Sequence, residues 1–313
     1  MRAVVVRTPG GPDALTLTEV PDPSAVGDQI LVTVDAAGVN PVDLGNRMDN
    51  GWADVETPYV VGYEFAGSVA DLNGCETDLQ VGEPVWGLLP VRGTRWGAYA
   101  EQVAVDVSTV ARRPAHLDAV TAAVLPLAGC TALQVLDRLD LQPGSWLLVH
   151  GGGGGVGHLL VQLAAARGIR VVAVSGTADR ERMVVLGAEM WVDRAATPSP
   201  AASAARKLGH PVDAAVDLVG GQLEAVQQHV TPGGSLATIV DLQGDFTDAV
   251  DRNLDIHGVL VRPSQHVLAS LALAVDHGLR PTVRGVFPLT DARTAHERLE
   301  AGGVGGKLAL TTS

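Results

Sequence analysis

Cysteine is scarce in this 313-residue sequence, which contains only Cys75 and Cys130. Two cysteines cannot build the disulfide framework of a small secreted domain, and they suit a reducing cytoplasm. Long apolar runs are also lacking, since none approaches the roughly twenty residues that span a bilayer. The N-terminus shows no apolar core followed by the cleavage site of a signal peptide. We therefore expect a cytoplasmic protein with no membrane-spanning segment.

Positive charge is in short supply, with 22 Lys and Arg against 35 Asp and Glu and a formal net charge of −13. A chain of this sign repels nucleic acid and anionic lipid, so neither is an expected partner. The acidic residues are spread along the chain, which favours an ordinary solvated surface. Two catalytic motifs are absent as well: the G-x-S-x-G turn of serine hydrolases and the H-E-x-x-H helix of zinc proteases.

A chain of this length with 46% apolar residues can bury a large core, and we expect two domains. Residues 1–122 show short apolar runs separated by turns rich in glycine and proline. The expected strands are 2–7, 15–20, 29–37, 62–71, 83–89 and 98–105. This pattern predicts a mostly antiparallel, barrel-like domain.

Residues 123–262 alternate between helical and strand patterns, beginning with an expected helix at 120–139. The expected strands are 145–150, 170–175, 190–193, 212–219, 235–240 and 255–261. Strands joined by helical crossovers predict an α/β fold with a doubly wound, parallel, six-stranded (Rossmann) sheet. Residues 263–313, with two expected helices and a closing strand, are expected to return to the first domain.

Five consecutive glycines follow the first apolar strand of this second domain. Gly152, Gly154 and Gly157 match the G-x-G-x-x-G spacing of a dinucleotide-binding turn, and Gly155 and Val156 lie between them. Glycines at this spacing permit a tight turn, bring the backbone close to a pyrophosphate and let the next helix pack on its strand. That helix points its positive dipole end at the phosphates. The strands on both sides favour this interpretation over a glycine-rich surface loop.

The residues that follow the next expected strand select the cofactor. An NAD site places Asp or Glu there, where the carboxylate binds the ribose hydroxyls. Here the strand ends in Ser175 and Thr177 with a glycine between them, and Arg180 and Arg182 follow. Guanidinium binds phosphate in a bidentate manner, whereas a carboxylate repels it. We predict NADPH, with Ser175, Thr177 and Arg180 at its 2′-phosphate; the alternative is that both arginines are solvated on the first turn of a helix.

Further short motifs lie along nearly the whole chain. They are GVNPVD at 38–43, GYEFAG at 62–67, LAGCTA at 127–132, LGA at 186–188, DLVGG at 217–221 and GK at 306–307. Together with the glycine turn, this set resembles the medium-chain dehydrogenase/reductase superfamily, in its zinc-free quinone oxidoreductase branch. The resemblance implies a Rossmann domain beside a GroES-like catalytic domain, with hydride transfer to a quinone or to the C=C bond of an enone.

The resemblance also implies the catalytic residues. In the zinc alcohol dehydrogenases of this superfamily, a Cys stands at the position of Asn40 and a His at that of Tyr63. This sequence has neither ligand, and it has no cysteine at 86–100, so we expect no metal. Asn40 would use its side-chain amide to bind a substrate carbonyl or to order the ribose. The alternative is that it caps a helix, and the two interpretations are compatible. Tyr63 would point into the cleft, or it would pack beneath the site as a structural residue.

The remaining site residues also come from the resemblance. Four of them would lie beside the cofactor: Thr131, Val219, Val240 and Leu242. Two would line the substrate pocket, Trp52 and Cys130. Trp52 stands where several relatives carry a tyrosine, so a phenol that could protonate the substrate is missing. A lone cysteine on an apolar helix is also typical of a buried, unreactive residue.

These observations favour an NADPH-dependent, zinc-independent reductase of small-molecule quinones or enones. One alternative is an enoyl-thioester reductase acting on a biosynthetic intermediate, for which Arg47, Arg92 and Arg95 are the basic candidates for binding a carrier. Another is an NADPH-binding protein without turnover. The apolar edge strand from Asp255 to Val261 also predicts a homodimer, in which two such edges pair antiparallel. A monomer with that edge covered by the loop at 243–247 is the alternative.

Overall fold

The computed structural model describes residues 1–51 and 53–312 and divides into two compact units. Residues 1–130 and 262–313 form the first, here called the β unit, and residues 131–261 form the second, the α/β unit. The first boundary thus follows residue 130, whereas the sequence placed it after residue 122. The reason is that Leu127 donates its backbone N–H to Glu64, and Gly129 packs on Leu271, and both partners belong to the β unit.

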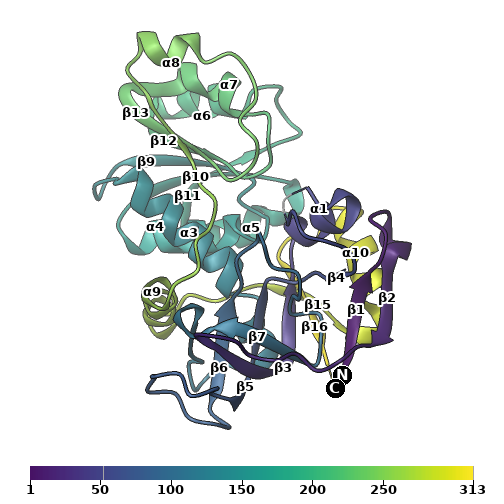
Figure 1. The fold of residues 1–313 in the computed structure, drawn as a ribbon. Helices are drawn as coiled ribbons and strands as arrows, with labels where there is room; N and C mark the ends of the chain where they lie inside the picture. Colours follow the sequence, from purple (N-terminus) through teal and green to yellow (C-terminus); the bar gives the residue numbers. More distant parts are fainter. Residues whose placement is uncertain (52, 313) are drawn as a thin grey trace. The chain divides into compact units, whose positions relative to one another are not determined.

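The β unit is built mainly of strands, most of which are labelled in Figure 1. Its strands are β1 (Arg2–Val6), β2 (Leu15–Glu19), β3 (Gln29–Val39), β4 (Tyr59–Val60), β5 (Glu64–Asp71), β6 (Pro84–Leu88), β7 (Gln102–Asp106), β8 (Val110–Arg112), β15 (Val283–Pro288) and β16 (Lys307–Thr311). Its helices are α1 (Pro41–Asp49), α2 (Ala119–Ala123), α9 (Gln265–Asp276) and α10 (Ala292–Glu300). Helix α3 (Pro126–Leu139) begins here and continues into the α/β unit.

The larger sheet of the β unit has the strand order β15-β16-β3-β5-β6-β8, and β7 also pairs with β3. A smaller sheet has the order β2-β1-β4. Alternate residues of β3, namely Ile30, Val32 and Val34, are buried, as expected for a strand with one face on the core. Because β3 ends at Val39, Asn40 lies at the strand end, directly before α1.

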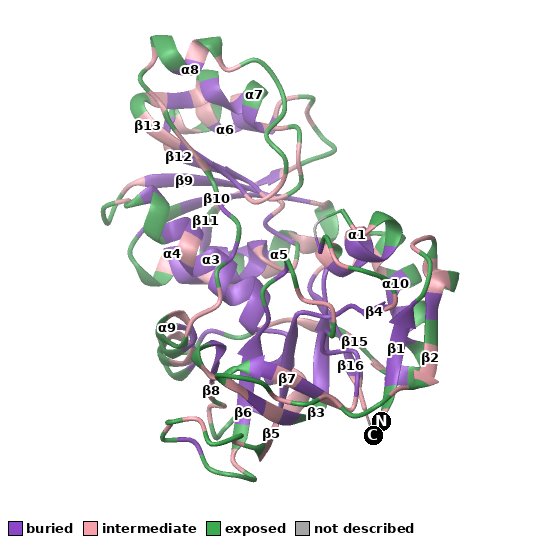
Figure 2. Ribbon diagram, in the orientation of Figure 1, coloured by how far each residue is buried: buried purple, intermediate pink, exposed green. Residues whose placement is uncertain are grey.

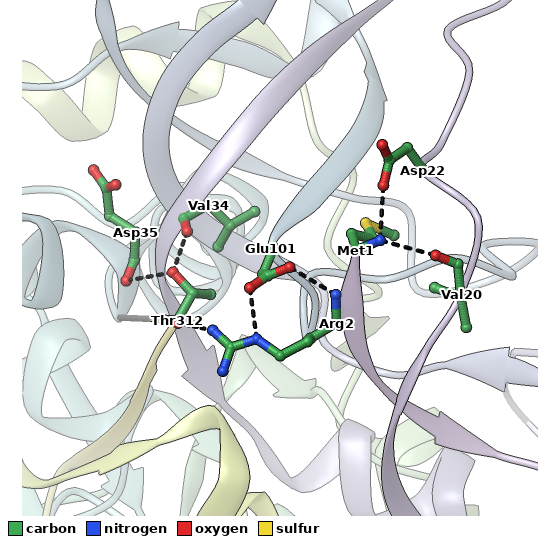
Figure 3. A network of polar contacts seen from close by, with 8 residues as sticks. All are labelled: Met1, Arg2, Val20, Asp22, Val34, Asp35, Glu101 and Thr312. Carbon is green, nitrogen blue, oxygen red and sulfur yellow. Dashed lines mark hydrogen bonds and ion pairs between the residues drawn. The ribbon is translucent and has the colours of Figure 1, made fainter.

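The N-terminal residues and the last described residues, up to Thr312, lie close together in the β unit (Figure 1). Arg2 donates from its backbone N and its Nε to the Glu101 carboxylate, at 2.7 Å each, and from Nη2 to the Thr312 carbonyl at 3.1 Å (Figure 3). Such exposed pairs contribute little stability. They do show that the end of β16 returns to the β unit beside β1, with which the chain begins, although the two strands belong to different sheets.

The α/β unit, in which every residue is described, contains one parallel six-stranded sheet. Its strands are β9 (Trp146–His150), β10 (Arg170–Ser175), β11 (Ala188–Asp193), β12 (Val212–Asp217), β13 (Val230–Thr238) and β14 (Asp255–Gly258), in the order β11-β10-β9-β12-β13-β14. Its further helices are α4 (Gly157–Ala166), α5 (Arg180–Val185), α6 (Pro200–Leu208), α7 (Leu223–Val226) and α8 (Thr247–Asp251). The order reverses beside β9, so the predicted fold class is confirmed.

The core of the α/β unit lies against this sheet. Leu148, Val172 and Leu236 on the strands pack with Ala204 of α6 and Leu223 of α7. Figure 2 shows β9, β10 and β12 as buried, whereas α8 carries exposed residues. No helix in the described ranges 1–51 and 53–312 is long and apolar enough to cross a membrane.

Several expected elements differ from the structure, among them the strand expected at 235–240, which is β13 and begins at Val230. The helix expected at 120–139 is two helices, α2 and α3, because Pro126 cannot continue a helix from the preceding turn. The strand expected at 98–105 begins only at Gln102. The edge strand expected to reach Val261 ends at Gly258, and the Val259 N–H donates inward to Thr238 O at 2.8 Å. Substitution of Val259 would therefore disturb the sheet itself rather than its free edge.

Candidate functional site

The glycine turn joins β9 to α4 at the carboxyl edge of the parallel sheet. Gly151 and Gly152 donate their N–H groups to Val174 O, at 3.1 and 2.9 Å. A Cβ on Gly157 would lie 2.1 Å from Gly151 O, so only glycine lets the helix pack this closely. Gly154 is exposed, and a Cβ there would meet only Gly151 O, at 3.3 Å. The turn thus has the packing glycines and the open backbone that a pyrophosphate requires.

Two guanidinium groups lie near the carboxyl end of β10, one beside Ser175 and Gly176 and one over the neighbouring Trp191 ring. Trp191 Nε1 donates to Ser175 Oγ at 2.9 Å, and Arg180 Cζ lies 5.6 Å from the centroid of the Trp191 ring. Arg194 follows β11, donates its backbone N–H to Ser175 O at 2.9 Å, and places Nε 3.9 Å from where a Gly176 Cβ would be. Arg194 was not predicted from the sequence, although neighbouring parallel strands end at the same edge of a sheet.

Two carboxylates near this strand end are engaged within the protein. Asp193 accepts from Thr177 Oγ1 at 2.6 Å and from Ala195 N at 2.9 Å, and these hydrogen bonds lower its pKa. Asp179 pairs with Arg182 at 2.5 Å, and Arg182 Nη2 also donates to a carbonyl of the glycine turn at 2.9 Å. Arg182 is therefore not solvated as the alternative interpretation expected, whereas Arg180 is exposed, in agreement with it. Thr177 already has a partner.

The end of β12 is organised by Asp217. Its carboxylate accepts three backbone N–H groups at 2.8 to 3.0 Å, which fix the following turn. Val219 in this turn is 58% exposed, and Leu242 after β13 is 52% exposed. Apolar side chains left open at this edge are compatible with the cofactor contacts predicted for Val219, Val240 and Leu242, which remain predictions.

Asn40 lies in a buried cluster of charged and polar groups in the β unit. Its amide Nδ2 donates to Glu64 Oε1 at 2.8 Å, and its Oδ1 accepts from Lys307 Nζ. Lys307 also pairs with Glu64 Oε1 at 2.8 Å, and Glu64 Oε2 accepts from Leu127 N at 2.7 Å. Glu64 and Lys307 are 0% and 2% exposed. An anion on one side and a cation on the other fix which way the Asn40 amide points.

Asn40 also stands at the N-terminus of α1, as the capping interpretation expected. There its backbone N–H donates to Asp43 Oδ2 at 2.7 Å, whereas its side chain is directed to Glu64 and Lys307. Asp43 is fully buried, and burial raises its pKa to about 7. The carboxylate of Asp43 thus caps the backbone of Asn40 and leaves the amide side chain available for other contacts.

Tyr63 is buried beneath the same region. Its hydroxyl accepts from Asn46 Nδ2 at 2.6 Å, and burial together with the nearby Asp43 raises its pKa. Tyr59 is also buried and donates to Asn46 O at 2.7 Å. This geometry favours the packed, structural interpretation of Tyr63, while its contact with substrate remains a prediction.

The other predicted residues are placed as follows. Thr131 is buried in α3. Cys130 is fully buried and burial raises the pKa of its thiol, which makes it unreactive. The predicted pocket residue Trp52 lies outside the described residues. Among the described ranges no group of three or more His, Cys, Asp or Glu is arranged to hold a metal ion.

Comparison with known proteins gives consistent matches. Residues 27–115 match a family model described as an alcohol dehydrogenase GroES-like domain, and residues 186–310 match one described as a zinc-binding dehydrogenase. The chain is 31% identical to an NADPH-dependent alkenal/one oxidoreductase of Arabidopsis thaliana, over 99% of this chain and 79% of that protein. It is 28% identical to a quinone oxidoreductase of Sus scrofa, over 99% and 97%.

A solved structure agrees with these sequence matches. The quinone oxidoreductase of Coxiella burnetii is 30% identical and superposes with a TM-score of 0.90 over 100% of this chain and 99% of that one. The fold and these matches show that the protein is an oxidoreductase whose fold is of the kind that binds a nicotinamide dinucleotide. The chain belongs to the medium-chain dehydrogenase/reductase superfamily, in its zinc-free quinone oxidoreductase branch.

Proposed function

We propose that this protein uses NADPH to reduce a quinone or the C=C bond of an α,β-unsaturated carbonyl. Relatives named for each of these activities match almost the whole chain. The bound dinucleotide supplies the hydride, and the protein orients it and stabilises the charge that develops on the substrate. We also propose, from the scarcity of cysteine, that the protein acts in the cytoplasm.

The observation that carries the choice of NADPH is the pair of guanidinium groups at the end of β10. Arg194 lies beside Ser175 and Gly176, and Arg180 lies over the ring of Trp191, which binds Ser175. The nearby carboxylates of Asp179 and Asp193 have partners within the protein. A 2′-phosphate carries about two negative charges, and each charge-assisted hydrogen bond to it contributes roughly 1.5–3 kcal/mol. NADH has only a hydroxyl at this position and gains neither contact.

The chemistry proposed for the β unit centres on Asn40. Hydride addition to an enone builds negative charge on the carbonyl oxygen, which needs a preorganised donor. An amide nitrogen carries two hydrogens, and Glu64 accepts one from Asn40. Lys307 donates to Asn40 Oδ1 and polarises the amide, which makes its N–H a stronger donor. We assign Asn40 as the donor to the substrate oxygen, with solvent supplying the proton.

One of the three basic residues considered for binding a carrier-bound thioester substrate is not available for that role. Arg47 is 1% exposed and is bound to Glu300 and to Gly10 O, so it cannot receive a phosphopantetheine phosphate. Arg95 donates to Pro58 O and lies over Trp96. A small, free substrate is therefore the better supported choice.

The test is a pair of binding titrations with NADPH and NADH. Arg194→Ala should weaken NADPH binding by roughly 10- to 100-fold, which corresponds to about 1.5–3 kcal/mol, and leave NADH binding nearly unchanged. Arg180→Ala should act in the same direction. Arg206, exposed on α6 of the same unit, provides the matched control, and Arg206→Ala should affect neither cofactor. Equal affinity of the unmutated protein for both cofactors would refute the choice of NADPH.

A further inference from the structure

A buried hydrogen-bonded chain links the C-terminal helix of the β unit to Asn40. Arg47 Nη1 of α1 lies 3.3 Å from His296 Nδ1 of α10. His296 Nε2 lies 3.2 Å from the Tyr99 hydroxyl, and that hydroxyl lies 3.1 Å from Asp43 Oδ2. The chain ends where Asp43 Oδ2 accepts the Asn40 backbone N–H at 2.7 Å. All five residues are at most 2% exposed.

Arg47 sets the direction of every hydrogen bond in this chain. A guanidinium can only donate, so His296 Nδ1 must accept. Burial and the neighbouring Arg47 lower the pKa of His296 to about 3, so the ring is neutral and its single proton is on Nε2. His296 Nε2 therefore donates to the Tyr99 oxygen. The Tyr99 proton is then directed at Asp43 Oδ2.

The two oxygens of Asp43 consequently differ. Oδ2 receives two donors, from Tyr99 and from Asn40. Oδ1 is buried without a hydrogen-bond partner in the part of the chain that the structure describes. The charged groups that face Asp43 from other elements are Lys307 of β16, which favours its ionised form, and Glu64 of β5, which disfavours it.

We propose that Arg47, His296 and Tyr99 are positioning residues for Asn40 and act on it through the Asp43 carboxylate. Tyr99 holds Asp43 Oδ2 in place, and Asp43 holds the Asn40 backbone where β3 ends and α1 begins. Helix α10 is far from Asn40 in sequence. Through this chain it sets the position of the Asn40 side-chain amide, which is the donor proposed above for the substrate oxygen. The catalytic consequence rests on the proposed function, whereas the coupling between the residues does not.

The coupling can be observed directly on Asn40. The method is NMR spectroscopy. The sequence contains only five asparagines, so protein labelled with ¹⁵N-asparagine gives a simple amide spectrum. The signal that disappears in Asn40→Asp is the one that belongs to Asn40. The chemical shift of an amide that donates to a carboxylate changes when the carboxylate is protonated. In the full-length protein the Asn40 backbone signal should therefore titrate with a midpoint near pH 7, the pKa to which burial raises Asp43.

Tyr99→Phe is the decisive variant. Tyr99 lowers the pKa of Asp43, so loss of its hydroxyl should raise the Asn40 midpoint by about one pH unit. Tyr59→Phe is the matched control, because Tyr59 is another buried tyrosine of this unit whose hydroxyl binds Asn46 O rather than Asp43. The control should leave the midpoint unchanged. An unaltered midpoint in folded Tyr99→Phe, or an equal shift in Tyr59→Phe, would overturn the proposal.

A second pair of variants keeps the proposal testable if Tyr99→Phe does not fold. His296→Phe removes the donor to Tyr99 and should shift the Asn40 midpoint upward, whereas His296→Gln supplies an N–H of similar reach and should restore it. In NADPH-dependent reduction, Tyr99→Phe should lower kcat about tenfold and leave KM for NADPH unchanged. Absence of turnover in the unmutated protein would refute the proposed function alone, because the amide titration needs no substrate.

Discussion

Removal of the Lys307 ammonium tests the energetics of the buried cluster around Asn40. Lys307 and Glu64 are 2% and 0% exposed, and their Nζ–Oε1 distance is 2.8 Å. Lys307→Met would leave the Glu64 carboxylate with donors only from Asn40 and Leu127, both neutral. Loss of one partner from a buried ion pair costs about 3–5 kcal/mol because the remaining charge is uncompensated. In a unit of this size, that corresponds to a fall of roughly 6–20 °C in melting temperature.

The assay is thermal unfolding followed by circular dichroism, with a double variant and a control. Glu64→Gln in the Lys307→Met background removes the uncompensated negative charge and should recover part of the lost stability. Arg170→Ala breaks the exposed pair with Glu189 and should barely move the melting temperature. A fall for Lys307→Met no larger than that for Arg170→Ala would show that the reasoning about the buried pair is wrong.

Four further predictions concern pH, the glycine turn, metal and assembly. The pKa of Asp43 is raised above its value in the unfolded chain, so folding is accompanied by uptake of a proton. The free energy of unfolding should therefore fall as the pH rises from about 4 to 7. Asp43→Asn should reduce the slope of melting temperature against pH over this range. Gly157→Ala should abolish dinucleotide binding, because its Cβ would lie 2.1 Å from a carbonyl oxygen, whereas Gly45→Ala, where a Cβ meets nothing within 4 Å, should be neutral in the same titration. Metal analysis should find no stoichiometric zinc, and about one zinc per chain would contradict the argument from Asn40 and Tyr63. Sedimentation should show a dimer at micromolar concentration, and Ile256→Pro should dissociate it. The reason is that the backbone N–H groups alternate along β14, which directs the Ile256 N–H away from β13 and towards the free edge. A dimer that tolerates the proline would place the interface elsewhere, and a monomer would show that there is none.

Local sequence patterns predicted much of the α/β unit. The glycine turn was recognisable because few other functions require glycine at this spacing, and β10 has the expected bounds. Pro126 also carried the signal for a helix break, which the helical periodicity on both sides obscured.

The side-chain network of the β unit was not predictable in the same way. Tyr99 and His296 are separated by 197 positions, and neither stands in a motif. Glu64 and Lys307 each lie in a recognised motif, but nothing local indicates that they pair across 243 positions. Arg194 was missed for a related reason, since its neighbour Ser175 belongs to another strand and only the sheet order brings them together.

The central proposal is that this protein transfers hydride from NADPH to a quinone or enone. The most direct measurement is stopped-flow absorbance at 340 nm, with NADPH-loaded protein mixed against 1,4-benzoquinone, a simple alkenone and crotonyl-CoA. We predict rapid loss of absorbance with the quinone or the alkenone, and a slower loss with the thioester. Oxidation with crotonyl-CoA alone would identify an enoyl-thioester reductase, and no oxidation with any of the three would contradict the proposed function.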